Sequence, residues 1–274
     1  MNSVSKSLRV VEAYRAVEGE GVMIGTPEVI VRLFGCNLTC SYCDEERSWV
    51  HGIIDPAAIS VFEDPAALVR HVRATIKSGG AGEKWVSLTG GEPMFRDPTL
   101  LSEFVVACHL DGLKVSVHTN GSIHHPPLMP LVDFWSVTPT LSSSENPALG
   151  SGTHMRALEG IFAHFRATLS NQRQDRAELK FAIGTLDDVD DAVEIARRLG
   201  PSLDAAGIPV VVQPVWPRTA PASASNAYGS WGPAGEVMAW LAQLQEMPAL
   251  RAIPRVRFLP QLHKLVRGVA APKS

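Results

Sequence analysis

The sequence predicts an α/β fold, a partial parallel β/α barrel close to a (β/α)6 arrangement. Short runs of β-branched and apolar residues recur along the chain, and segments with helical apolar spacing separate them. Strands that alternate with helices favour a parallel sheet with right-handed crossovers. The chain has 274 residues, of which 45% are hydrophobic and 19% charged, so it can bury a sizeable core.

The first predicted strand, residues 29–34, is an apolar run interrupted by Arg32. Asp64-Pro65 then begins a helix, because Asp accepts hydrogen bonds from free N–H groups and Pro has no N–H to lose there. Asp97-Pro98 begins another helix in the same way, and its apolar face includes Cys108. The other predicted strands are residues 84–88, 114–117, 134–137, 178–183 and 209–212, and the other predicted helices are residues 158–169 and 187–199.

We expect a single domain over residues 1–274, with two insertions that break the alternation. The first, near residues 142–175, is long and polar. The second, near residues 217–232, is rich in Ala, Ser, Pro and Gly and is expected to be a mobile loop.

Composition excludes several classes of protein. The net charge is −3 and the pI is about 6.3, so the chain has no global basic field for nucleic acid. The first residues lack the apolar core of a secretory signal, and no apolar run approaches the ~20 residues that span a bilayer. We therefore expect a soluble, cytoplasmic protein with neither a nucleic-acid nor a membrane partner. Four cysteines are too few for a disulfide scaffold in a chain of this length.

Unusual residues follow the predicted strands. In a parallel barrel the loops after the strands share one rim, where active sites lie. The sequence therefore places its chemistry on one face of the barrel. These loops contain Cys36 to Cys43, Gly90-Gly91-Glu92, Thr119-Asn120, Thr138-Pro139 and Gln213-Pro214.

Cys36, Cys40 and Cys43 form a C-x3-C-x2-C run after the first predicted strand. Three thiolates on one tight loop can face a single centre. A 4Fe–4S cluster normally takes four cysteines, so three would leave one iron open to an outside ligand. A zinc site completed by a histidine such as His51 is the alternative. The remaining cysteine, Cys108, occupies an apolar helical position typical of a core thiol.

The cysteine spacing is the signature of the radical SAM enzymes, which this chain resembles. A second match supports the resemblance, because Thr89-Gly90-Gly91-Glu92-Pro93 is similar to the GGEP motif of that family. The resemblance implies a 4Fe–4S cluster whose open iron binds the amino and carboxylate groups of S-adenosyl-L-methionine. The reduced cluster would pass one electron to the sulfonium and release a 5′-deoxyadenosyl radical.

Further motifs resemble the 7-carboxy-7-deazaguanine synthase family, whose members are ring-contracting carbon–nitrogen lyases of 7-deazapurine and queuosine biosynthesis. The resemblance implies conversion of 6-carboxy-5,6,7,8-tetrahydropterin to 7-carboxy-7-deazaguanine. The radical would abstract a hydrogen at the carboxylate-bearing carbon, and ammonia would leave. The motifs are Glu18-Gly19-Glu20-Gly21, Gly35-Cys36-Asn37-Leu38, His118-Thr119-Asn120-Gly121, Glu178-Leu179-Lys180, Val212-Gln213-Pro214 and Leu259-Pro260-Gln261-Leu262-His263-Lys264.

The resemblance also implies roles for single residues. Arg32, Glu20 and His263 would be catalytic, with Arg32 on the substrate carboxylate and Glu20 on the pterin N–H groups. Residues on the substrate would be Val17, Glu18, Gly19, Glu20, Arg32, Thr89 and His263. Residues around the cluster-bound cofactor would be Tyr42, Asp44, Gly90, Gly91, Glu92, Asn120, Thr138, Lys180 and Gln213.

Three positions depart from the family pattern. Glu45 stands where the family has a Thr that ligates Mg²⁺, and a carboxylate is also a good ligand for that ion. We therefore expect Mg²⁺ at Glu45, with direct contact between Glu45 and the substrate as the alternative. Thr140 replaces a Lys, and Glu18 replaces a Gln. These departures put the exact substrate in question more than the class of reaction.

The partners implied are a small pterin substrate, a flavodoxin or ferredoxin as electron donor, and a second copy of the chain in a homodimer. Two other functions stay open on sequence alone. One is a different radical SAM enzyme, such as an activase that installs a glycyl radical on a partner protein. The other is a zinc-stabilised binding module.

Overall fold

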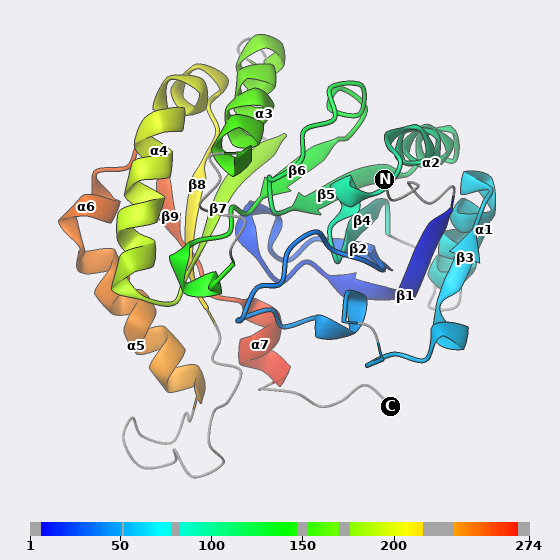
Figure 1. Ribbon diagram of the computed structural model, residues 1–274, viewed down its shortest axis with the longest axis horizontal. Coiled ribbons are helices and arrows are strands. Elements are labelled where there is room, and N and C mark those ends of the chain that lie inside the picture. The colour runs from blue at the N-terminus through cyan, green and yellow to red at the C-terminus, as the bar shows by residue number, and fades with distance from the viewer. Residues whose placement is uncertain are drawn as a thin grey trace.

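The computed structural model describes residues 7–50, 52–77, 83–146, 153–169, 176–215 and 233–267 (Figure 1). One sheet crosses this part of the chain in the order β3-β1-β2-β4-β5-β6-β7-β8-β9. From β2 to β9 all neighbouring strands are parallel, whereas β1 pairs antiparallel with both β2 and β3. The strands are β1 Leu8–Val17, β2 Pro27–Leu33, β3 Ser60–Phe62, β4 Trp85–Gly90, β5 Lys114–Thr119, β6 Phe134–Val137, β7 Ala177–Ile183, β8 Val210–Pro214 and β9 Val256–Phe258.

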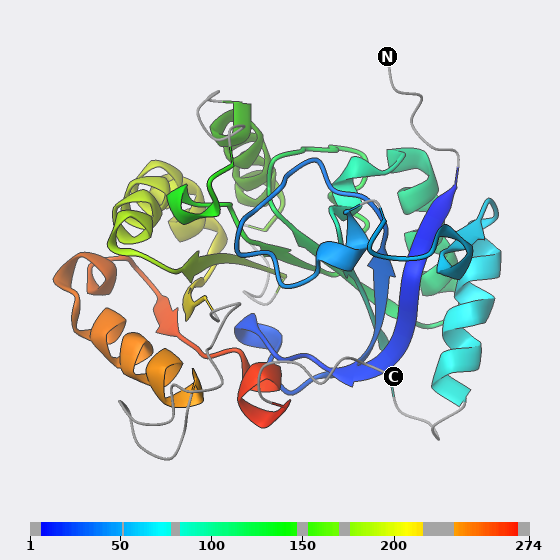
Figure 2. The ribbon, with the colours of Figure 1, turned by 60° about the horizontal axis from the view of Figure 1, so that its bottom comes forward.

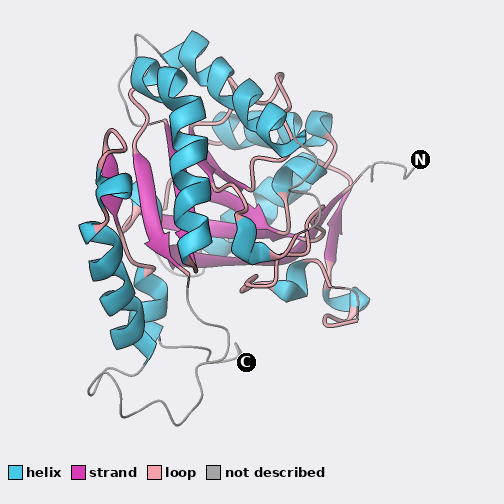
Figure 3. Cartoon of the chain, turned by 60° about the vertical axis from the view of Figure 1, so that its left-hand side comes forward, coloured by secondary structure: helices cyan, strands magenta, loops and turns pink. Residues whose placement is uncertain are grey.

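Helices cover the outer side of the curved sheet (Figure 3). Two of them begin as predicted, because Asp64 accepts from Ala66 N and Asp97 accepts from Thr99 N. The helices are α1 Pro65–Lys77, α2 Pro98–Leu110, α3 Thr153–Leu169, α4 Leu186–Ala206, α5 Pro233–Glu246, α6 Pro248–Arg251 and α7 Leu262–Arg267. The 3-10 turns are η1 Gly21–Met23, η2 Glu46–Ser48, η3 Pro56–Ala58, η4 Pro93–Phe95 and η5 Ser142–Ser144.

The prediction of a partial parallel β/α barrel is confirmed. Every predicted strand is present within a few residues of its expected bounds, and the sheet keeps free edges at β3 and β9. The prediction missed β1 because this strand precedes the β/α alternation and pairs antiparallel. The single-domain prediction over 1–274 stays a prediction. The expected mobile loop at 217–232 lies outside the described residues.

Helix α4 was predicted to end near residue 199, but it continues to Ala206 through Pro201. Proline removes a backbone hydrogen bond and strains a helix interior. Burial of Leu203 and Ala206 in the core favours continuation past that point. Gly207, with φ 67°, then ends the helix in the left-handed conformation.

The two faces of β2 differ sharply. Val29, Val31 and Leu33 are fully buried in the core cluster that includes α1, and each contributes about 1.5–3 kcal/mol by burial. The alternate residues Glu28 and Arg32 lie on the opposite face, because side chains of a strand alternate between its two sides. The inner side of the sheet therefore carries polar and charged groups. Within the described residues, no helix combines the length and the apolarity needed to cross a membrane.

Candidate functional site

The cysteine loop follows β2 at the carboxyl end of the parallel strands. Cys36, Cys40 and Cys43 are all reduced and half-buried. Polar groups lie near their sulfurs: Trp49 Nε1 donates to Cys43 Sγ at 3.2 Å, and Thr140 Oγ1 lies 3.9 Å from Cys40 Sγ. Burial raises the pKa of the three thiols, for Cys36 to about 12.

These residues fit an iron–sulfur cluster. Three half-buried thiols on one loop supply three of the four cysteine ligands that a 4Fe–4S cluster normally takes. Hydrogen bonds to cysteine sulfur are also known to adjust the reduction potential of an iron–sulfur cluster. No group of His, Cys, Asp and Glu in the described part of the chain converges on a point that one metal ion could fill. Cluster cysteines bind different irons, so they need not converge in that way. Cys108 lies in the apolar core and is fully buried.

The glycine turn after β4 is bonded to the start of the cysteine loop. Gly91 N donates to Leu33 O at 3.0 Å, and Glu92 N donates to Gly35 O at 2.9 Å. A Cβ on Gly91 would collide with the carbonyl of Gly35. Glycine is thus required at position 91 because two backbones touch. The two loops hold each other at a fixed separation.

Glu92 is buried, and its hydrogen bonds connect the ends of β4 and β5. Its carboxyl accepts from Met94 N at 2.8 Å, from Thr119 Oγ1 at 2.7 Å and from Asn120 N at 2.7 Å. Burial raises the pKa of Glu92 to about 7 despite these donors. Asn120 Nδ2 in turn donates to Asn37 Oδ1 of the cysteine loop at 3.2 Å. Glu92 therefore positions Asn120, and a direct contact of Glu92 with the cofactor stays a prediction.

The loop after β1, residues 18–20 (the acidic loop), turns into the polar side of the sheet. Glu18 Oε2 lies 3.0 Å from His118 Nε2, and Glu20 Oε2 lies 2.5 Å from Lys180 Nζ. Burial opposes the charge of both carboxylates, but their cationic partners hold the pKa of each below its ordinary value. The pKa values of His118 and Lys180 are raised in return, against the effect of their own burial. Both carboxylates are thus ionised acceptors.

The segment 261–264 at the start of α7 (the closing segment) contacts both loops. Gln261 Nε2 donates to Glu20 Oε1 at 2.6 Å, and Lys264 Nζ lies 2.9 Å from Asp44 Oδ2. The ring of His263 covers Gly19, where a Cβ would come 2.4 Å from His263 Nδ1. Figure 2 shows α7 beside the turn η1 that follows the acidic loop. The closing segment therefore joins the acidic loop to the cysteine loop.

Arg32 lies among three charged side chains. Its Nε is 2.8 Å from Glu12 Oε1 and 3.2 Å from Glu45 Oε2. Glu45 is also held by Arg47, whose Nε and Nη2 donate to its two oxygens at 2.9 Å and 3.1 Å. Burial disfavours the charged form of Arg32, but the neighbouring Glu45 and Glu12 carboxylates raise its pKa. An Mg²⁺ ion at Glu45 would first have to displace a guanidinium.

The other residues of the predicted site differ in their burial and in their contacts. Lys180 pairs with Glu20 of the expected substrate set, and its contact with the cofactor stays a prediction. Thr89 is the register partner of Arg32 on β4. Gln213 is buried on β8, and its Oε1 has no hydrogen-bond partner among the described residues. Tyr42 and Thr138 are half-buried, whereas Val17 is exposed, so only the backbone of Val17 suits the role expected of it.

The prediction missed several charged residues of this region. Glu178 is buried and accepts from Val22 N and Ser136 Oγ, each at 2.7 Å. Its spacing from Lys180 on β7 puts both on one face, which is a usable sequence signal. His118 stands in a quoted motif without an assigned role. No local pattern indicates the partners of Glu12 and Arg47.

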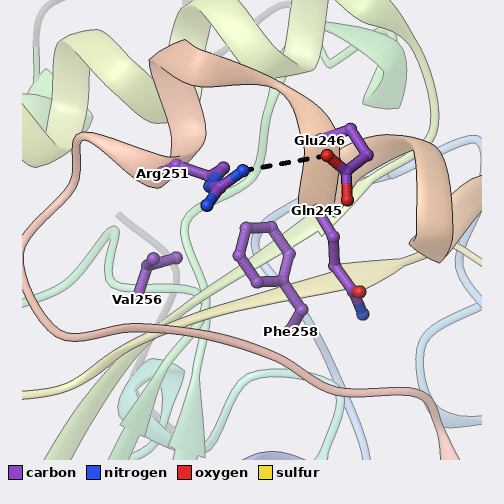
Figure 4. A pocket seen from close by; sticks show the side chains of 5 residues that line it. All are labelled: Gln245, Glu246, Arg251, Val256 and Phe258. Atoms are coloured by element: carbon purple, nitrogen blue, oxygen red, sulfur yellow. Dashed lines mark ion pairs between the residues drawn. The ribbon is translucent and has the colours of Figure 1, made fainter.

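A surface groove of about 460 Å³ lies elsewhere, between α5, α6 and β9 (Figure 4). A single ion pair of 3.7 Å, between Arg251 and Glu246, crosses it. None of its lining residues belongs to the predicted site, so the chemistry of the loops identifies the site better than this groove does.

Comparison with known proteins supports one family. The chain matches no protein-family model. It is 31% identical to a 7-carboxy-7-deazaguanine synthase of Pyrobaculum aerophilum over 196 residues, which cover 69% of this chain and 72% of that protein. It is 26% identical to a protein of the same name from Methanopyrus kandleri, over 94% of this chain and 93% of that one.

A solved structure supports the fold alone. "Crystal structure of QueE from Escherichia coli" aligns with a TM-score of 0.53 and 19% sequence identity, over 76% of this chain and 83% of that one. The curated relatives place the chain among the radical SAM lyases of 7-deazapurine biosynthesis, a family whose cofactors are a 4Fe–4S cluster, S-adenosyl-L-methionine and Mg²⁺. The chain belongs to the 7-carboxy-7-deazaguanine synthase family.

Proposed function

We propose that this chain converts 6-carboxy-5,6,7,8-tetrahydropterin to 7-carboxy-7-deazaguanine with release of ammonia. The observation that carries the proposal is the closing segment, which contacts the acidic loop through Gln261 and the cysteine loop through Lys264. Carboxylates suited to the N–H groups of a pterin therefore lie in a loop that the closing segment joins to the loop that would hold the cluster.

Cys36, Cys40 and Cys43 would hold the cluster, which when bound supplies the electron that cleaves S-adenosyl-L-methionine. The backbone of Gly91 packs against Gly35 at the start of that loop, and the backbone of Gly90 packs against Leu33 at the end of β2, so the glycine turn is held beside the cysteine loop. Asn120 is fixed by Glu92 at the same rim. These residues would orient the cofactor beside the cluster.

The acidic loop and Arg32 would recognise the two ends of the substrate. Glu20 stays ionised beside Lys180, so it accepts hydrogen bonds from N–H groups of the pterin. Glu12 and Glu45 both hold the Nε side of the Arg32 guanidinium. Its Nη2 donates to the Tyr14 hydroxyl at 3.2 Å, so a substrate carboxylate would pair with Nη1 and share or replace the Tyr14 contact. His263 would close the pocket over Gly19.

An anaerobic assay tests the proposal. The chain is reconstituted with iron and sulfide, reduced, and supplied with S-adenosyl-L-methionine and the carboxylated pterin. We expect 7-carboxy-7-deazaguanine and ammonia in equal amounts, measured by chromatography and an ammonia assay. A loaded enzyme that cleaves S-adenosyl-L-methionine but leaves the pterin unchanged would contradict the proposed substrate.

Arg32→Lys is expected to weaken substrate binding by ten- to a hundred-fold. Lysine cannot reproduce the planar pairing of a guanidinium with a carboxylate, and a lost charged hydrogen bond costs about 1.5–3 kcal/mol. Binding of the pterin is measured by calorimetry, and cleavage of S-adenosyl-L-methionine without substrate should not change. Arg197→Lys, in an exposed ion pair with Glu194 on α4, is the matched control. An unaltered pterin affinity in Arg32→Lys would refute the role of Arg32.

Turnover is expected to fall when Mg²⁺ is chelated and to recover when it is added back. Glu45 offers the oxygen ligands that Mg²⁺ prefers, but Arg47 now holds both of them. Arg47→Gln should therefore lower the Mg²⁺ concentration needed for half-maximal turnover, and Glu45→Ala should raise it. Full turnover of the parent enzyme in excess chelator would end the metal hypothesis and favour direct contact of Glu45 with the substrate.

We also propose a flavodoxin or ferredoxin as electron donor, a homodimeric assembly and a cytoplasmic location. The electron donor is proposed because the cluster must be reduced by one electron before it can cleave S-adenosyl-L-methionine. The relatives support the pterin substrate. Sedimentation tests the assembly, and a monomer at micromolar concentration would contradict it.

A further inference from the structure

Arg96 follows the turn η4, and its guanidinium lies against the first residue of the cysteine loop. A Cβ on Gly35 would come 2.7 Å from Arg96 Nη2. Gly35 also has φ 104°, which favours glycine. Because Gly35 has no side chain, the guanidinium of Arg96 can contact the cysteine loop directly before Cys36.

Arg96 forms no ion pair among the described residues, although the acidic groups of Glu92 and Cys36 act on it from farther away. Its Nε is buried without a hydrogen bond, and its guanidinium stacks on the Phe95 ring at 4.9 Å. A second cation, Arg9, lies near and stacks on Phe34 at 4.6 Å. Burial lowers the pKa of Arg96, and Arg9 lowers it further, while Cys36 and Glu92 act in the opposite direction. The guanidinium groups of Arg96 and Arg9 thus lie near each other beside the start of the cysteine loop.

A half-buried guanidinium with an unpaired buried Nε and no ion pair favours a ligand of opposite charge nearby. The group proposed for the cysteine loop has that charge. Three thiolates outweigh the two positive charges of an oxidised 4Fe–4S core, and reduction adds one more negative charge. A fixed cation beside Cys36 therefore stabilises the reduced form more than the oxidised one.

We propose that Arg96 is a positioning residue that raises the reduction potential of the cluster through its charge. One electron passes from an external one-electron donor to the cluster; the donor is oxidised, the cluster is reduced, and Arg96 keeps all its protons. The inference rests on the proposed function only for the presence of the cluster. The identity of the substrate does not enter it.

The test is a redox titration of the reconstituted holoprotein without substrate, reduced by dithionite and followed by electron paramagnetic resonance. Arg96→Gln should make reduction about tenfold less favourable, a shift of about 59 mV to more negative potential. Arg96→Lys, which keeps the charge, should restore most of the parent potential. Arg197→Gln on exposed α4 should leave the potential unchanged.

Iron content and thermal unfolding of each variant separate loss of charge from loss of structure. An unchanged potential in Arg96→Gln, or equal shifts in the Gln and Lys variants, would overturn the proposal. If Arg96→Gln binds no cluster, the reduction potential of Arg9→Gln is measured in its place. A smaller shift to more negative potential would support the electrostatic effect of these two arginines on the cluster, and an unchanged potential would reject it. A parent that shows this behaviour but does not convert the pterin would refute only the proposed substrate.

Discussion

Replacement of Cys36, Cys40 or Cys43 by Ala is expected to abolish cleavage of S-adenosyl-L-methionine. Each thiolate would hold a different iron, so two remaining ligands cannot keep the cluster in place. Cys108→Ala should retain full cleavage, because Cys108 is buried in the core on α2. It should lose about 1 kcal/mol of stability, as a typical core substitution does.

The measurement is 5′-deoxyadenosine formed per chain under anaerobic conditions, together with the iron content. Cys108→Ala serves as the matched control, since it removes the same chemical group from another part of the fold. A Cys40→Ala variant that still forms 5′-deoxyadenosine at the parent rate would remove Cys40 from the ligand set.

Lys180→Met is expected to lower the free energy of unfolding at pH 7 by about 3–5 kcal/mol, because it removes the cationic partner of the largely buried Glu20 carboxylate and leaves it only the hydrogen bond from Gln261. In the parent, the pKa of Glu20 is below its ordinary value. Glu20 therefore stabilises the fold above the pKa of the unfolded chain, and this contribution is lost as the pH falls. In Lys180→Met the pKa of Glu20 should rise instead, so the deficit should shrink as the pH falls and Glu20 takes up a proton.

Urea unfolding at pH 7 and pH 5 measures this effect. Lys180→Met combined with Glu20→Gln should recover part of the lost stability, because the carboxylate that lost its cationic partner is then neutral. An equal deficit at both pH values would show that the loss comes from packing and not from the charge of Glu20.

The strands and the loops that follow them were predictable, because apolar periodicity is local. The cysteine spacing and the glycine turn were local signals too, and the contact between these loops confirms that they lie together. The pairing of Lys180 with Glu20 was not predictable, since 160 positions separate the two residues. The ion pairs of Arg32 and Arg47 likewise depend on how the cysteine loop folds back over β1 and β2.

The contacts of the closing segment have a consequence for the order in which the protein is made. Gln261 follows Glu20 by 241 positions. At about 5–20 residues per second, the ribosome needs roughly 10–50 s to synthesise the chain between them. During that time the cysteine loop has already been synthesised, but Lys264 is not yet present to pair with Asp44 of that loop. A cell that assembles the cluster on this chain therefore has an interval in which the three thiols are accessible to a cluster donor and equally open to oxidation.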